Sequence, residues 1–178
     1  MKKPMCSSYI LAIDPGNIKS AYCLISTGDL KPLEKRKVDN ECLLDLLRSI
    51  DEKHLKNACI EMIGHYGTGM PAGKSVFDTC LWIGRFSEAI YERTNKLPTY
   101  IMRSEEKMLL CGTMKAKDSN IRQALIDRFA KFDFKNGKGT KKNQDWFYGF
   151  SADCWQAYAV GITYAEKVMD VKNEESQA

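Results

Sequence analysis

The sequence contains no closely spaced cysteine pair and only two histidines, His54 and His65. Zinc ribbons and zinc fingers need closely spaced pairs of ligands, and none of the seven cysteines stands in a C-x-x-C arrangement. Most of these cysteines lie inside apolar runs, which favours small buried hydrophobic residues in a reducing compartment. The pattern therefore argues against a structural zinc site and against a disulfide framework.

Long apolar runs are also missing. No segment approaches the roughly 20 apolar residues that a membrane-spanning helix needs. The lysines at positions 2 and 3 are not followed by the apolar segment of a secretory signal peptide. No repeat or flexible linker divides the 178 residues, a length that suits one domain with a substantial core. We therefore expect a single domain over residues 1–170, a polar tail over 171–178, and a cytoplasmic protein that does not contact a membrane.

Charge is unevenly distributed. The net charge is +4, but the stretch from Arg103 to Lys142 holds eleven Lys and Arg against five Asp and Glu, so the remainder of the chain is slightly acidic. A basic region suits a polyanion such as nucleic acid. A solvated face that binds nothing is the simpler explanation of any single charge run, so this pattern needs a second observation.

Apolar patterning predicts five strands and five helices. Short apolar or alternating segments predict strands at Tyr9–Ile13, Ser20–Ser26, Pro32–Val38, Asn57–Met62 and Thr99–Met102. Three- and four-residue apolar spacing predicts helices at Glu41–Lys53, Ser75–Arg93, Glu105–Leu110, Asn120–Ala130 and Ala152–Val168. We expect helix caps at Asp39 or Asn40 and at Asp118 or Ser119. This order indicates an α/β fold with a mixed five-stranded sheet flanked by helices.

Three carboxylates stand where apolar elements begin or end. Asp14 follows the run Tyr9–Ile13, Glu61 follows another apolar run, and Asp153 opens an apolar helix. Each has an ordinary structural explanation, as a turn residue, an exposed strand end or a first-turn helix residue. Carboxylates gathered at the edge of a parallel core repel one another unless a divalent cation lies between them, which is the arrangement of metal-dependent phosphodiester hydrolysis. Their order and spacing together favour a metal site.

The segment Ile10–Gly16, the strand-end Glu61 and the run Ser151-Ala152-Asp153 resemble the RuvC family of Holliday junction resolvases, in the RNase H-like superfamily. The resemblance covers Tyr9 to about Lys167, and the run Lys74–Phe86 is most similar to bacteriophage-encoded members. It implies an RNase H-like fold and a crossover junction endodeoxyribonuclease, a structure-selective DNA endonuclease that resolves Holliday junctions and branched DNA by divalent-metal-dependent phosphodiester hydrolysis. For a phage-encoded protein, this activity belongs in the host cytoplasm.

The resemblance implies that Asp14, Glu61 and Asp153 are both the catalytic residues and the ligands of Mg²⁺ or Mn²⁺, with two ions in each active site. Asp14 would bridge both ions, and Glu61 and Asp153 would each complete one site. Family members also dimerise, so that two active sites cut opposing strands of a four-way junction. The resemblance therefore implies a homodimer, for which the helix predicted at Ser75–Arg93 is the candidate interface, although its apolar stripe also suits a core.

The chain departs from the family at one ligand. Most members carry an acidic or histidine ligand three residues before the last aspartate, and this chain has Phe150 there. Asp145 and Asp118 are the candidates to replace it, and either also suits an ordinary loop or cap role. A non-catalytic branched-DNA-binding protein with a degenerate RNase H-like site is therefore the alternative function.

The resemblance also implies contacts with DNA. Lys107 matches one lysine that contacts the scissile phosphate region in the family, and Lys115 and Lys117 lie nearest the second. An aromatic residue of the glycine-studded loop inserts at the junction centre in the family, which makes Tyr66 the candidate and His65 the second choice. The expected DNA-binding residues are Tyr66, Lys74, Lys107, Lys115, Lys117, Lys138, Lys141 and Lys142.

Overall fold

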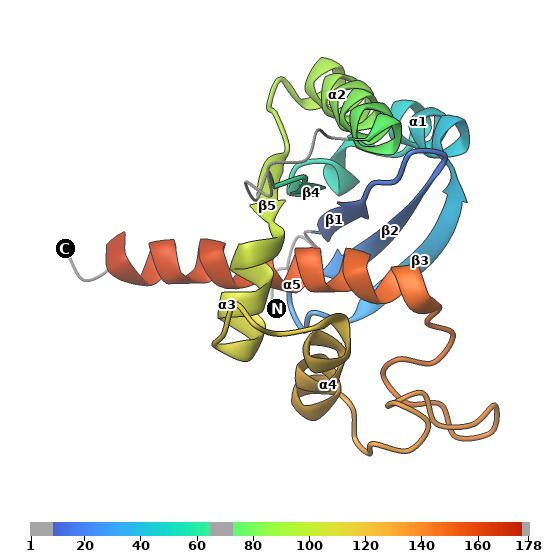
Figure 1. Cartoon of the computed structure of the whole chain (residues 1–178), viewed down its shortest axis with the longest axis vertical. Coiled ribbons are helices and arrows are strands. Elements are labelled where there is room, and N and C mark those ends of the chain that lie inside the picture. The colour runs from blue at the N-terminus through green and yellow to red at the C-terminus, as the bar shows by residue number, and fades with distance from the viewer. Residues whose placement is uncertain (1–8, 65–72, 176–178) are drawn as a thin grey trace, which may run out of the picture.

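The computed structural model describes residues 9–64 and 73–175, with side chains described as far as Val168 (Figure 1). One mixed sheet has the strand order β3-β2-β1-β4-β5. Its strands are β1 (Tyr9–Asp14), β2 (Lys19–Ser26), β3 (Pro32–Asp39), β4 (Ala58–Met62) and β5 (Thr99–Met102). The pairs β1–β2 and β2–β3 are antiparallel, whereas β1–β4 and β4–β5 are parallel. This confirms the predicted fold class and all five strands.

Five α-helices pack around the sheet: α1 (Asn40–Ser49), α2 (Lys74–Thr94), α3 (Arg103–Cys111), α4 (Asp118–Phe129) and α5 (Ala152–Glu175). Figure 1 shows α1 and α2 on one side of the sheet and α5 across the other. Strand β1 is apolar on both faces because it lies between these layers. Leu11 and Ile13 pack with α1 and α2, while Ile10 and Ala12 pack with α5. Among the described residues, no helix combines the length and the apolar character that crossing a bilayer requires.

The helix boundaries differ most from the sequence prediction at the ends of α1 and α5. Helix α1 ends at Ser49, and a separate 3₁₀ turn spans Glu52–His54, because Ile50 takes an extended backbone conformation. Helix α4 begins at Asp118 itself, so its cap is Lys117 rather than Asp118 or Ser119. Helix α5 continues to Glu175, past the predicted end at Val168.

The cap predicted at Asp39 or Asn40 is at Asp39, but its side chain makes no capping hydrogen bond. The Asp39 carboxylate lies 3.5 Å from the Lys19 ammonium instead. Asn40 is the first residue of α1, and its side chain is buried. The position of the cap was therefore predicted, but the hydrogen bond that usually accompanies it was not formed.

Phe150 belongs to the core. Its side chain is 3% exposed, and its ring centroid lies 5.1 Å from those of Phe147 and Trp155 and 5.6 Å from that of Tyr158. This aromatic cluster fixes the chain where it enters α5. The position three residues before Asp153 therefore supports the packing of α5 on the sheet and does not face the carboxylates.

We predict that Phe150→Ala destabilises the protein by about 3–5 kcal/mol, the usual cost of removing a buried phenylalanine. Chemical denaturation followed by circular dichroism measures this change. Phe134→Ala is the matched control, because that phenylalanine is 58% exposed, and a surface substitution usually costs within about 0.5 kcal/mol. Equal denaturation midpoints for the two variants would contradict the position of Phe150 in the core.

Candidate active site

The ends of two parallel strands bring Asp14 and Glu61 together. Ile13 of β1 is paired with Ile60 of β4, so the next residue on each strand emerges at the same edge of the sheet. Both carboxyl groups are partly buried, and they lie within hydrogen-bonding reach of each other. The sequence-based pairing of these two strand ends is therefore correct in its geometry.

The turn after Asp14 is braced by two buried polar side chains, Ser20 and Asn40, of which the sequence analysis named Asn40 only as a possible helix cap. The Ser20 hydroxyl donates to Asn40 Oδ1 at 2.6 Å and accepts from the Gly16 N–H at 3.1 Å. Asn40 Nδ2 donates to the Gly16 carbonyl at 2.8 Å. A Cβ atom at Gly16 would stand 2.3 Å from the Lys19 carbonyl oxygen, so this turn requires glycine. These contacts hold the backbone next to Asp14 in one conformation.

Burial raises the pKa of both carboxyl groups, and the charge of Glu61 raises that of Asp14 further. Burial, then Glu61 and Asp153, raise the pKa of Asp14 to about 8, against the opposing effect of Arg103. The pKa of Glu61 is also raised, because burial outweighs the stabilising charge of Arg103. Two ionised carboxylates in contact favour either a shared proton or a bound cation.

Asp153 lies close to this pair, but its carboxylate contacts a lysine side chain. It stands in the first turn of α5, and its charge raises the pKa of Asp14. Its carboxylate lies 2.9 Å from the ammonium of Lys37 on β3. In residues 9–64 and 73–168, no three His, Cys, Asp or Glu side chains come together as a ready metal-binding group. The structure thus assembles two of the three predicted carboxylates and leaves the third beside them.

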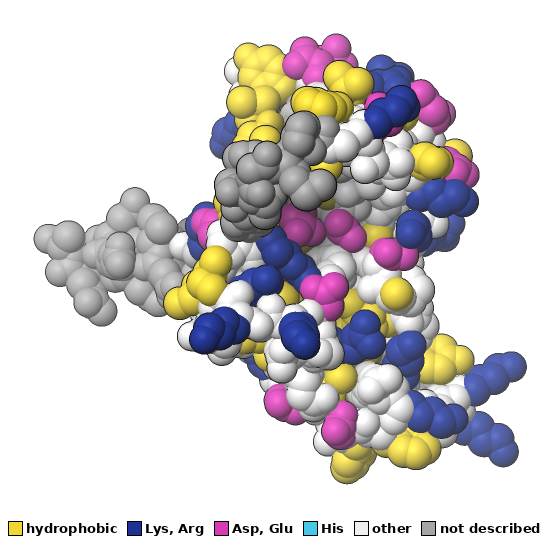
Figure 2. All heavy atoms as spheres, viewed as in Figure 1, with side chains coloured by type: hydrophobic (Ala, Val, Ile, Leu, Met, Phe, Trp, Pro, Cys, Tyr) yellow, Lys and Arg dark blue, Asp and Glu magenta, His cyan; other side chains and the backbone are white. Residues whose placement is uncertain are grey.

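A cavity of about 380 Å³ opens over the carboxylate pair, and its lining includes Asp14, Asn17, Glu61, Thr79 and Arg103. Figure 2 shows acidic side chains gathered near the centre of this face, with Lys and Arg side chains around them. Asp14 and Glu61 offer the hard oxygen donors that Mg²⁺ and Mn²⁺ prefer. The donor chemistry therefore fits a divalent cation, and Asp153 is the nearest further carboxylate.

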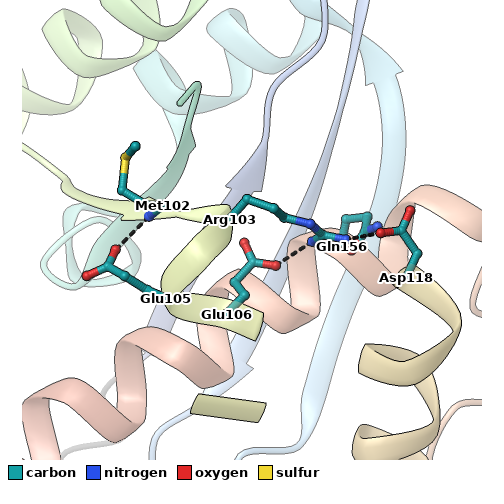
Figure 3. Close-up of polar contacts among 6 residues, drawn as sticks. All are labelled: Met102, Arg103, Glu105, Glu106, Asp118 and Gln156. Atoms are coloured by element: carbon teal, nitrogen blue, oxygen red, sulfur yellow. Dashed lines mark hydrogen bonds and ion pairs between the residues drawn. The ribbon is translucent and has the colours of Figure 1, made fainter. Parts of the chain in front are cut away.

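Arg103 and Glu106 are site residues that the sequence analysis missed. The Glu106 side chain is 0% exposed, its Oε2 accepts from Arg103, and its Oε1 has no partner among the described residues. Burial and the charge of Glu61 raise the pKa of Glu106 to about 9. Figure 3 shows Glu106, Asp118 and Gln156 converging on Arg103 from α3, α4 and α5. No sequence signal separates Glu106 from Glu105, because only the orientation of α3 decides which one faces the site.

The two candidates for the missing ligand have different surroundings. Asp145 accepts hydrogen bonds from the backbone N–H groups of Lys131, Phe132 and Trp146, at 2.7 to 3.1 Å. Burial opposes these bonds, but they outweigh it and lower the pKa of Asp145. Asp145 is therefore an organiser of the loop before α5. Asp118 pairs with Arg103 and lies near enough to Glu61 to raise its pKa.

The predicted DNA-binding lysines lie at several places on the surface. Lys74 pairs with Asp78 one turn along α2, and Lys107 is half-buried on α3. Lys115 and Lys117 are exposed between α3 and α4, as are Lys141 and Lys142 in the loop before α5, where Lys138 is half-buried. Figure 2 shows Lys and Arg side chains projecting from that loop at the lower right. Tyr66 and His65 lie outside the described residues.

The loop before α5 is more ordered than its glycine and lysine content suggests. Gly139 and Gln144 form an isolated antiparallel bridge, and Gly137 and Gly139 have φ angles of 66° and 68° that favour glycine. The Asp145 side chain ties the two ends of the loop together through its backbone hydrogen bonds. The loop therefore folds back on itself, and its lysines project from a hydrogen-bonded backbone.

Neither a protein-family model nor a curated protein sequence matches this chain. Among solved structures, Thermus thermophilus RuvC bound to a Holliday junction substrate matches with a TM-score of 0.61 and 12% identity, over 90% of this chain and 94% of that chain. Another T. thermophilus RuvC structure matches with a TM-score of 0.60 and 13% identity, over 90% of this chain and 96% of that chain. The yeast mitochondrial Holliday junction resolvase Ydc2 matches with a TM-score of 0.50 and 14% identity, over 96% of this chain and 84% of that chain. The chain therefore has the RuvC-like, RNase H-like α/β fold.

The raised pKa of Asp14 predicts a pH-dependent stability in the absence of divalent cations. Between pH 4 and pH 8 the folded protein holds a proton that the unfolded chain has lost, so stability falls as pH rises. Asp14→Asn lacks this proton, so we expect its Tm to exceed that of the wild type increasingly from pH 5 to pH 8. A difference of about 1 kcal/mol in the free energy of unfolding shifts Tm by roughly 2–4 °C for a chain of this size.

Thermal melts in EDTA across this pH range measure the difference between wild type and Asp14→Asn. Asp127→Asn is the control, because Asp127 is exposed on α4 and accepts from Gln123 at 2.8 Å, away from the carboxylate pair. Parallel Tm profiles for wild type and Asp14→Asn would contradict the raised pKa.

Proposed function

We propose that this protein is a divalent-metal-dependent, structure-selective DNA endonuclease that resolves Holliday junctions and related branched DNA. The observation that carries the proposal is the Asp14–Glu61 pair, placed under a cavity at the ends of adjacent parallel strands. The fold supports it, because the similar structures include RuvC with a Holliday junction substrate and a mitochondrial Holliday junction resolvase. The run Lys74–Phe86 favours the bacteriophage type of this enzyme, acting on DNA in the cytoplasm.

Asp14 and Glu61 would hold the cation, with Asp153 as the third ligand after it leaves Lys37. Bound Mg²⁺ or Mn²⁺ supplies an activated water and stabilises the leaving oxygen, with two ions in the full arrangement. The protein holds Asp14 in place through the braced turn at Gly16. Lys37 and Arg103 beside the carboxylates provide positive charge for the approaching phosphate.

Asp153 can leave Lys37 and bind a metal cation at little cost in free energy. Both partners of this ion pair are roughly two-fifths exposed. Exposed pairs of this kind contribute only about 0–1 kcal/mol to stability. The contact between Lys37 and Asp153 is therefore compatible with a metal-binding role for Asp153.

The basic stretch from Arg103 to Lys142 supports DNA as the substrate. It contributes exposed lysines at Lys115, Lys117, Lys141 and Lys142, while the half-buried Lys107 and Lys138 lie in the same stretch. Lysines contact the phosphate backbone without reading sequence, which suits an enzyme that selects its substrate by shape. We include Lys74 and Tyr66 in the proposed DNA contact on the resemblance alone.

A homodimer is part of the proposal, with α2 as the interface. Phe77 and Leu81 are exposed on this helix, whereas Phe86 and Ala89 of the predicted stripe are buried in the core. Apolar side chains left exposed on one helix suit an isologous contact with a second copy. Two active sites related by a two-fold axis would then face two strands of a four-way junction.

The second candidate function is a branched-DNA-binding protein without catalysis. The contact of Asp153 with Lys37 favours it, as does the lack of a ready three-residue metal group among the described residues. The core position of Phe150 points the same way, because it removes the ligand that the family places there. Cleavage of a junction in Mg²⁺ decides between the two functions.

We predict that the wild type cuts a synthetic four-way junction in Mg²⁺ and that Asp14→Asn does not, while its affinity for the junction is equal or higher. The amide removes a metal ligand at nearly constant shape and reduces the repulsion of phosphate. Gel analysis of labelled junctions measures cleavage, and anisotropy in EDTA measures affinity. Asp127→Asn should cut at the wild-type rate. An Asp14→Asn variant that cuts as fast as wild type would refute the metal site, and a wild type that binds without cutting would favour the second function.

A second prediction concerns the loop before α5. Replacing Lys138, Lys141 and Lys142 together by alanine should flatten the dependence of log K on log salt, by roughly 0.9 for each duplex phosphate that the variant no longer neutralises. The matched control replaces Lys31, Lys56 and Lys96 by alanine. These lysines are exposed just before β3, β4 and β5, at the end of the sheet opposite to Asp14 and Glu61. Salt titrations of junction affinity give both slopes. An equal change in the two triple variants would show that these loop lysines contribute only overall charge.

A further inference from the structure

Arg103 is held between one buried and one exposed carboxylate. Its side chain is 17% exposed, whereas that of Glu106 is 0% exposed and that of Asp118 is 67% exposed. Arg103 Nη1 donates to Glu106 and, at 2.8 Å, to Gln156 Oε1, and Nη2 donates to Asp118 (Figure 3). Arg103 also lines the cavity above Asp14 and Glu61. Arg103 therefore has two partners inside the protein, Glu106 and Gln156, and one partner at the surface, Asp118.

The buried partners of Arg103 contribute more to stability than the exposed partner Asp118. Breaking a buried hydrogen bond leaves a polar group without water or a partner and is destabilising, so the contacts with Glu106 and Gln156 fix where the guanidinium lies. An exposed ion pair contributes little to stability, because water competes for both groups. The contact with Asp118 can therefore be exchanged for another anion, while the position of Arg103 stays the same.

We infer that Arg103 is a phosphate-binding residue for the DNA backbone and that Asp118 occupies its free side when DNA is absent. A guanidinium presents the same planar pair of donors to a carboxylate and to a phosphate. Asp118 is the first residue of α4 and is largely solvent-exposed, so rotation of its side chain is enough to release Arg103. Arg103 lines the same cavity as Asp14 and Glu61, where the scissile phosphate lies in the proposed function on which this inference rests.

The inference makes Asp118 a competitor of the substrate. Removing its charge should strengthen binding of DNA, and the gain should depend on Arg103. A general charge effect would also strengthen binding but would not need Arg103. A role of Asp118 as the missing metal ligand predicts a different result, namely loss of cleavage in Mg²⁺ without a change of affinity in EDTA.

The test is a double-mutant cycle on the full-length protein, with a fluorescently labelled four-way junction titrated in EDTA. We expect Asp118→Asn to tighten Kd by about 3- to 10-fold, and Arg103→Gln to weaken it by about 10-fold, the size of one charge-assisted contact. Asp118→Asn should have no effect in the Arg103→Gln background. Asp127→Asn, which removes an exposed carboxylate from the same helix, should change Kd less than about twofold.

Folding is controlled separately, because Arg103→Gln leaves Glu106 buried without a cation. Arg103→Gln combined with Glu106→Gln replaces both ionisable groups by amides that can hydrogen-bond to each other, and thermal melting of every variant checks the fold. If both Arg103 variants unfold, the comparison of Asp118→Asn with Asp127→Asn decides the question alone. The inference is overturned if these two single variants bind alike, if Asp118→Asn still tightens binding without Arg103, or if the wild type does not bind the junction.

The outcome also separates this inference from the proposed function. A wild type that binds the junction but does not cut it, together with tighter binding by Asp118→Asn, would support the role of Arg103 and refute the nuclease activity. A wild type that cuts the junction, together with unchanged affinity in Asp118→Asn, would support the activity and overturn the role of Arg103.

Discussion

The repulsion between Asp14 and Glu61 is the constraint on which the rest of the site depends. The parallel pairing of β1 with β4 places both carboxyl groups at one sheet edge, and burial deprives them of water. Only a proton, a cation or a neighbouring positive charge can relieve that repulsion. Arg103 stands beside the two carboxyl groups, and the raised pKa of Asp14 favours a proton between them. A divalent cation would be the third, and it is the one that phosphodiester hydrolysis uses.

The sequence was sufficient to predict the sheet and the carboxylates at the ends of two of its strands. A strand buried on both faces is apolar along its whole length, so the first charge after Tyr9–Ile13 marks the sheet edge. The same reasoning predicts Glu61, and the first turn of an apolar helix predicts Asp153. The end of α1 was not predictable, because Ile50 continues the apolar spacing of the helix while its backbone turns extended.

The contacts around the carboxylates were not predictable, because they depend on how helices face one another. Glu105 and Glu106 are adjacent acids on α3, yet one pairs with Lys167 at the surface and the other is buried beside Arg103. Phe150 occupies a position where the family resemblance implies a ligand, but the aromatic cluster under α5 turns it inward. These differences leave the fold unchanged and alter which side chains reach the site, which is why the function is argued from the site rather than from the fold.

The central claim is that the Asp14–Glu61 pair binds a divalent cation. A crystal of the protein soaked in Mn²⁺, with diffraction measured at the manganese absorption edge, tests this most directly. We expect an anomalous peak in ligand contact with both carboxylates, and loss of that peak in Asp14→Asn. Clear density for both side chains without an anomalous peak between them would contradict it.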